Sequence, residues 1–260
     1  MNVVDKQGLI IQGGTGSFPT TCYDNFYENP DYIREYALTL DYSNDGGYFT
    51  GFRTDCLSTI NEEFHHKSAK KILSMFGDFD TSIDPAEWKC NSYFHKHWAY
   101  SNDPNHILNT GWVHTDGDCT LAAVVYLDPN PNIDAGTSTY RIKDEYLEDG
   151  EFKYDEHPDY PDEKMLKIRR DATRTLDSCN INTGKEYAIC LRNNNKHFEK
   201  TLEVKNNYNR IIIYDGDKFH GQSSIYKDNE DIRLTQVFFF YEIMAPFINI
   251  PKWRCEVDGI

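Results

Sequence analysis

Three strongly apolar segments limit the folds open to this chain more than any other feature of its sequence. They run from Thr120 to Leu127, from Ile211 to Tyr214 and from Leu234 to Ile243. β-branched and aromatic side chains dominate them, which favours buried strands over helices. Asp128-Pro129 ends the first segment and Asp215-Gly216-Asp217 ends the second, as turns between strands do. The segments therefore predict a core built from sheets.

A further strand is predicted from Asn91 to Tyr100, where Tyr93, His95 and His97 fall on one face. Strands at this density, joined by Gly, Asn, Asp and Pro turns, indicate an antiparallel double-sheet jelly roll. The predicted fold class is therefore mainly β with flanking helices, a double-stranded β-helix of the cupin-like kind.

Two flanking helices are expected in the N-terminal part. Asn29-Pro30-Asp31 is typical of a helix start, and apolar residues then recur at helical spacing up to Leu40. A second helix is predicted from about Thr59 to Phe76. His65 and His66 on this helix diverge by about 100°, which makes them a poor metal-binding pair.

The predicted organisation is one domain spanning residues 1–260. Residues 1–88 supply helical support, residues 89–140 and 208–245 form the jelly-roll core, and residues 141–207 form an insertion or lid. Within the insertion, Glu163–Leu176 is expected to be a helix, whereas Tyr187–Leu191 is typical of a strand.

The charge of the chain argues against nucleic acid as a partner. Lys and Arg total 27 against 42 Asp and Glu, a formal charge of −15, which repels phosphate backbones and anionic membranes. Such a surface would suit a basic or neutral substrate. Neither a membrane-spanning segment nor a secretory signal is expected, and seven scattered cysteines without a CxxC pair favour reduced thiols. The expected location is the cytoplasm.

His114-Thr115-Asp116 is the first candidate for chemistry. Residues two apart in a strand point to the same side, so the imidazole and the carboxylate can bind one metal ion. Phe219-His220-Gly221, just after an apolar strand, offers a third ligand. Two histidines and one carboxylate are typical of non-haem iron(II) oxygenases. The alternative is that His114 is a core histidine and Asp116 a turn cap.

Arg233 and Thr235 are the second candidate. Arg233 follows His220 by 13 residues (233 − 220) and lies in the apolar run Ile232–Phe240, where an unpaired guanidinium is costly. A guanidinium binds a carboxylate through two parallel hydrogen bonds, and Thr235, on the same side of the strand, adds a hydroxyl. The alternative is an internal salt bridge.

With these motifs the chain resembles the 2-oxoglutarate/iron(II) dioxygenase superfamily, in its prolyl 4-hydroxylase-like branch. The matching stretches are His114–Asp116, Val124–Pro129, Ala135–Ser138, Phe219–Gly221 and Arg233–Thr235. Asn29–Asp31 and Tyr48–Arg53 are similar to uncharacterised, partly viral members. The ordered motifs cover about residues 90–140 and 208–245. Many members of the branch have Lys where Arg233 stands, and the spacing of 104 residues (220 − 116) between Asp116 and His220 exceeds that of compact members.

The resemblance implies iron(II) on His114, Asp116 and His220, with 2-oxoglutarate as co-substrate on Arg233 and Thr235, and O2 as oxidant. A tyrosine that assists the co-substrate is either Tyr126 or Tyr93. The implied activity is hydroxylation of a peptide or amino-acid-like substrate coupled to succinate formation, in the host cytoplasm if the chain is viral.

Two other classes remain open from the sequence. One is a non-catalytic cupin-like jelly roll that binds ligands or serves a structural role. The other is a different metal enzyme, such as a cupin isomerase or dioxygenase, whose sites are usually richer in histidine.

Overall fold

The computed structural model describes residues 2–4, 10–12, 20–44, 49–75, 87–117, 119–148, 151–152, 181–227 and 232–244. Its elements in chain order are β1 (Asn2–Val4), β2 (Ile10–Gln12), β3 (Thr21–Tyr23), α1 (Pro30–Thr39), β4 (Phe52–Arg53), α2 (Leu57–Ile60), α3 (Glu62–Ser74), β5 (Glu87–His97), η1 (Ile107–Asn109), β6 (Leu121–Tyr126), β7 (Thr137–Ile142), η2 (Asp144–Tyr146), β8 (Leu147–Glu148), β9 (Glu151–Phe152), α5 (Ile181–Asn195), β10 (Phe198–Val204), β11 (Ile211–Asp215), β12 (His220–Gln222) and β13 (Arg233–Met244). No helix in these segments is long and apolar enough to cross a membrane.

The strands form two main antiparallel sheets. The large sheet has β5, β13, β6 and β11 at its centre, and the small sheet has the order β10-β7-β12. His114 extends the small sheet through an isolated bridge to His220. Along the chain, β5, the His114 segment, β6, β7 with β10, β11, β12 and β13 alternate between the two sheets. This alternation is the topology of a double-stranded β-helix, so the predicted jelly roll is confirmed.

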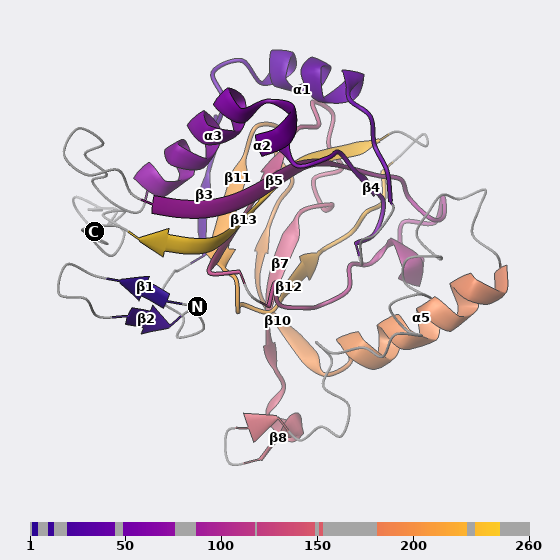
Figure 1. Cartoon of the computed structure of the whole chain (residues 1–260). Helices are drawn as coiled ribbons and strands as arrows, with labels where there is room; N and C mark the ends of the chain where they lie inside the picture. Colours follow the sequence, from indigo (N-terminus) through magenta and orange to yellow (C-terminus); the bar gives the residue numbers. More distant parts are fainter. Residues whose placement is uncertain are drawn as a thin grey trace, which may run out of the picture.

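The large sheet has two different faces. Its outer face carries Phe94, Leu121, Ile213 and Phe238, which pack with α1 and α3 into the largest apolar cluster of the described residues. In Figure 1 these helices lie on one side of the large sheet and the small sheet lies on the other. The inner face and the small sheet enclose the space in which the candidate site lies.

The three apolar runs form β6, β11 and β13, as predicted. The predicted helix start near Pro30 is also confirmed, because the Asn29 side chain accepts a hydrogen bond from the Tyr32 N–H at 3.2 Å. The helix predicted from about Thr59 to Phe76 is confirmed as α3, Glu62–Ser74, although it does not begin at Thr59. Asn61 ends α2 and caps α3 instead, with its side chain accepting from the Phe64 N–H at 3.1 Å.

The segment 141–207 differs from the predicted insertion in two places. Tyr187–Leu191 is helical within α5, because Tyr187, Ala188 and Leu191 bury one side of a helix rather than alternate faces of a strand. In addition, β10 pairs with β7 as an edge strand of the small sheet and is therefore part of the jelly roll. The helix predicted for Glu163–Leu176 lies outside the described residues.

Candidate metal centre

The HxD segment and the strand β12 meet at the rim of the small sheet. The backbone N–H of His114 donates to the His220 carbonyl at 2.9 Å, and the His220 N–H donates to the His114 carbonyl at 2.8 Å. This reciprocal pair places the two imidazole rings 4.4 Å apart. Gly221 permits the approach, since a Cβ there would lie 2.9 Å from the Trp112 carbonyl oxygen. Two histidines 106 residues apart in the chain (220 − 114) thus share one site.

Asp116 completes the cluster from just beyond the bridge. Its Oδ1 lies 3.7 Å from His114 Nε2, and its Oδ2 lies 3.4 Å from His220 Nε2. One ligand atom from each of these three residues lies within 4.8 Å of the others. The Asp116 N–H donates to the Gly216 carbonyl at 2.9 Å, so the carboxylate is set by the turn after β11 and not by a continuous strand.

Both histidines are oriented by backbone carbonyls. His114 Nδ1 lies 2.9 Å from the Trp112 carbonyl, and His220 Nδ1 lies 2.8 Å from the Lys218 carbonyl. A carbonyl only accepts, so Nδ1 carries a proton in each ring, and in the neutral ring the lone pair is then on Nε2. Metal-binding histidines are typically held in this way by an acceptor on the far nitrogen. The described residues thus present two imidazole nitrogens and a carboxylate oxygen, a donor set that fits a first-row divalent metal.

The strand that carries His114 is held by two asparagines at the end of α5. Asn195 accepts from the Val113 N–H at 3.0 Å through its side-chain oxygen and donates to the Gly111 carbonyl at 2.9 Å. Asn194 donates to the Val113 carbonyl at 2.9 Å. These amide groups satisfy backbone positions that a neighbouring strand would otherwise satisfy. They act as positioning residues for His114, and nothing in the local sequence pattern indicated them.

We predict that Asn195→Ala lowers the free energy of unfolding by about 1–3 kcal/mol, because two backbone groups of the His114 strand lose their partner. Iron(II) affinity should fall about 10–100-fold, as is typical when the support of a metal ligand is removed. Asn193→Ala is the matched control, since Asn193 is exposed on the same helix. Iron titration of the folded variants measures the effect, and unchanged affinity in Asn195→Ala would show that these contacts serve stability alone.

The three residues of the candidate metal cluster face a pocket that lies between the two sheets. The cavity has a volume of about 100 Å³, opens to solvent, and is lined by aromatic residues and a few polar groups. Tyr187 of α5 stacks on Trp112, with ring centroids 6.3 Å apart, and both line this pocket. The pocket is therefore a small, partly open cavity beside the candidate metal cluster.

Arg233 and Thr235 lie on the inner face of the large sheet and line the same pocket. Arg233 is 2% exposed, and its Nε donates to the Ala135 carbonyl at 2.9 Å. Its Nη2 atom is buried and has no hydrogen-bond partner within the part of the chain that the structure describes. Burial lowers the pKa of this guanidinium, while Tyr126 and Asp128 oppose the shift.

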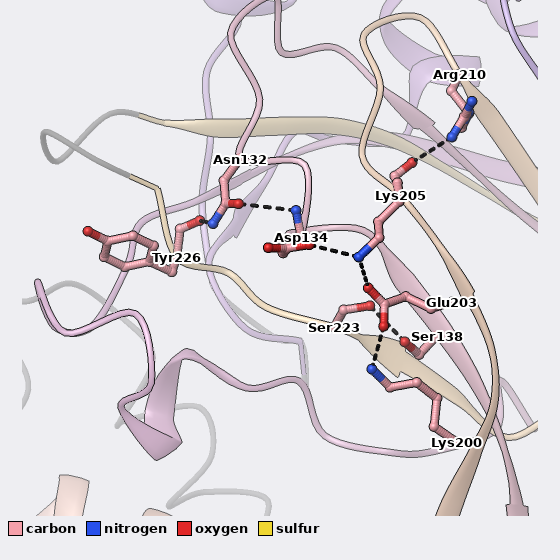
Figure 2. Close-up of polar contacts among 9 residues, drawn as sticks. All are labelled: Asn132, Asp134, Ser138, Lys200, Glu203, Lys205, Arg210, Ser223 and Tyr226. Carbon is pink, nitrogen blue, oxygen red and sulfur yellow. Dashed lines mark hydrogen bonds and ion pairs between the residues drawn. The ribbon is translucent and has the colours of Figure 1, made fainter.

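The loop that binds Arg233 is fixed from both ends. Lys205 contacts the Asp134 carboxylate at 2.7 Å, and Asn132 donates to the Tyr226 carbonyl at 2.9 Å (Figure 2). Ala135, which accepts from Arg233, lies in the same loop. The polar network of Figure 2 therefore supports the position of the guanidinium although it is itself outside the pocket.

The two candidate tyrosines differ in their surroundings. Tyr126 is fully buried, donates to Thr137 Oγ1 at 2.7 Å and lies with its ring 5.7 Å from Arg233 Cζ. Burial raises the pKa of Tyr126 to about 12, so the hydroxyl stays protonated at neutral pH. Tyr93 lies instead beside Arg53, whose Cζ is 5.6 Å from its ring. Thr137 lines the pocket, and so Tyr126 can influence it through this hydroxyl pair.

His95 and His97 lie on the inner face, as the alternation predicts, with ring centroids 4.0 Å apart. His95 lines the pocket. Burial is the main cause that holds the pKa of His95 well below its usual value, and His97 and Arg53 lower it further. His97 contacts Thr50 Oγ1 at 2.8 Å through Nε2. Both histidines are therefore held by contacts with Thr50 and do not belong to the candidate metal cluster.

Fold and site together define a jelly-roll protein with a partly exposed His/Asp/His cluster and a buried arginine in one pocket. The chain belongs to DUF6445, a family of unknown function, which matches residues 10–240. No functionally curated protein matches it.

Several solved structures are similar to this one. HygX from Streptomyces hygroscopicus, with nickel and 2-oxoglutarate bound, is 13% identical over 86% of this chain and 83% of its own, with a TM-score of 0.47. The viral collagen prolyl hydroxylase of Paramecium Bursaria Chlorella virus-1 is 10% identical over 87% and 90%, with a TM-score of 0.42. A Pseudomonas putida prolyl-4-hydroxylase is 9% identical over 86% and 92%, with a TM-score of 0.39.

Proposed function

We propose that this protein is an iron(II)- and 2-oxoglutarate-dependent oxygenase that hydroxylates a peptide or amino-acid-like substrate. One observation carries the proposal: the His114, Asp116 and His220 cluster and the buried Arg233 line the same pocket. Neither half would suffice alone, since a metal cluster without an anion site fits many enzymes. A metal site and a buried guanidinium in one cavity fit a co-substrate that chelates the metal and carries a second carboxylate.

The donor set supports iron(II) as the resident metal. Two neutral imidazoles and one carboxylate supply three ligands and leave further positions for small molecules, as in non-haem iron(II) oxygenases. The carbonyls of Trp112 and Lys218 accept from Nδ1, which leaves Nε2 of each neutral imidazole as the atom that would bind the metal. His114 is the most exposed ligand, with 31% of its side chain accessible, so the metal site opens toward the pocket.

Arg233 and Thr235 would bind the distal carboxylate of 2-oxoglutarate. The Nη2 atom of Arg233 supplies a donor, and the Thr235 hydroxyl, on a side chain only 1% exposed, supplies another. Tyr126 lies opposite Thr235 in the sheet and beside the guanidinium. Its role would be to fix Thr137 and the apolar side of Arg233 and not to coordinate the metal.

Bound iron(II), 2-oxoglutarate and O2 would together convert a substrate C–H group to C–OH, with 2-oxoglutarate leaving as succinate and carbon dioxide. The chain's own task is to position the reactants and exclude water from the oxidant. Aromatic side chains such as Trp112, Tyr214 and Phe239 line the pocket and suit that second role.

The test is an anaerobic titration of the metal-free protein with iron(II) and then with 2-oxoglutarate. A visible metal-to-ligand charge-transfer band that requires both additions is the expected result, because it reports chelation of iron by the keto acid. Succinate release in air would then guide a substrate screen. Iron binding without such a band, in folded protein, would contradict the proposal and favour a non-catalytic jelly roll.

A further inference from the structure

Arg53 lies in the same pocket as the proposed reaction but has no part in the roles assigned so far. It belongs to β4, which pairs with β5 so that Arg53 lies directly opposite His95. His95 in turn lies opposite Thr235 of β13. Directly opposed residues in antiparallel strands share a face. Arg53, His95 and Thr235 therefore form one row across the inner face, and all three line the pocket.

Three aromatic rings surround the Arg53 guanidinium. Its Cζ lies 4.2 Å from the ring centre of Phe49, 5.3 Å from that of Phe239 and 5.6 Å from that of Tyr93. These distances are typical of cation–π contacts, which use the flat face of the guanidinium. Carboxylates bind instead to its edge, in the plane of the N–H groups. The aromatic contacts thus orient Arg53 without competing for the atoms that recognise an acid.

The charge balance of the pocket wall is positive, opposite to that of the whole protein. Among the described residues, the charged side chains that line it are those of Arg53, Arg233 and Asp116, which sum to +1. Iron(II) and 2-oxoglutarate at the proposed site add +2 and −2, so the loaded pocket keeps a formal charge of +1. The whole chain carries −15. A positive interior beneath an acidic surface points to a ligand that is acidic where it binds.

We infer that the primary substrate carries a carboxylate and that Arg53 binds it beside the metal centre. This inference rests on the proposed function, since it assigns Arg233 to the co-substrate and Arg53 to the substrate. It also reverses the expectation from the surface charge, which favours a basic or neutral substrate. Within the pocket, the nearby cation outweighs the diffuse field of surface acids that water and salt screen.

The test compares two probes of nearly equal shape, benzoate and benzamide, by anaerobic calorimetric titration. The protein is loaded with iron(II) and saturating 2-oxoglutarate, so that Arg233 is occupied. Wild-type protein should bind benzoate at least tenfold more tightly than benzamide. Arg53→Gln should lose this preference, whereas Arg53→Lys should keep part of it. Lys96→Gln is the control. Lys96 follows His95 in β5, and its side chain contacts Tyr42, so this variant removes one positive charge near Arg53 from a residue that does not line the pocket.

Each outcome decides the question. Equal binding of the two probes, or no binding of benzoate, would overturn the inference. So would a preference that survives in Arg53→Gln, because benzoate would then be bound by the metal or another cation. The charge-transfer band is recorded on the same samples. A band without the benzoate preference refutes only the role of Arg53, whereas absence of the band refutes the proposed function.

A true substrate, once found by succinate release, gives an independent check. Arg53→Gln should raise its KM at least tenfold and change kcat less, because Arg53 binds the substrate but is not a metal ligand. A merely structural role would instead lower thermal stability and leave the ratio of acidic to neutral substrates unchanged.

Discussion

His220→Ala is expected to abolish iron binding and turnover while the jelly roll still folds. His220 is the most buried of the three ligands, with 6% of its side chain exposed, and its Nε2 faces Asp116 Oδ2 at 3.4 Å. Mutation of a residue that supports a metal ligand typically lowers metal affinity or activity about 10–100-fold. Loss of a ligand itself should therefore lower iron affinity more than about 100-fold. Iron content after gel filtration and succinate release measure the two effects.

The control for this prediction separates ligation from packing. The His220 ring contacts those of His114 and Tyr214 in tilted arrangements, with ring centroids 4.4 Å apart in each pair, so alanine also creates a cavity. His220→Gln restores much of the volume but not the imidazole nitrogen, and it should fail in the same way. His66→Ala removes an exposed histidine of α3 and should bind iron normally. Normal iron content in both His220 variants would place the metal elsewhere.

Local sequence signals were sufficient for the centre of the fold. β6, β11 and β13 are buried on both faces or nearly so. Their sequences are therefore continuous apolar runs, from which the strands could be predicted. β10 could not be predicted in this way. Its two ends, Phe198 and Val204, are buried, but Glu199, Lys200 and Thr201 between them are not. An edge strand of this kind has no apolar periodicity, and its polar composition is typical of a loop.

The candidate site was predictable where its residues are close in sequence or follow an apolar strand. His114 with Asp116, and Arg233 with Thr235, belong to such short motifs. Arg53 and Asn195 do not, since their positions depend on the pairing of β4 with β5 and on the docking of α5. An Asn-rich helix end is typical of a loop in sequence, and here tertiary contacts determine its role.

Arg233→Met is expected to abolish 2-oxoglutarate binding without loss of iron. Among the described residues of the pocket, Arg233 is the cation that lies beside Thr235 of β13 and Tyr126 of β6. Methionine fills a similar volume but carries no charge. The charge-transfer band should be absent and iron content normal. A loss of iron together with the band would mean that Arg233 supports the metal ligands instead.

The effect of Arg233→Met on stability shows whether Arg233 binds the anion of a ligand or forms a salt bridge within the protein. A buried cation without a protein anion costs free energy, and replacing buried charges by apolar residues is often neutral or stabilising by about 1–4 kcal/mol. Ligand-free Arg233→Met should therefore be at least as stable as ligand-free wild type. Saturating 2-oxoglutarate should raise the stability of wild type by about 2.7 kcal/mol at 100 times its Kd and leave the variant unchanged.

Destabilisation of ligand-free Arg233→Met by about 3 kcal/mol or more would instead indicate a salt bridge within the protein. Thermal unfolding with and without the co-substrate thus decides whether Arg233 is kept for function at the expense of stability.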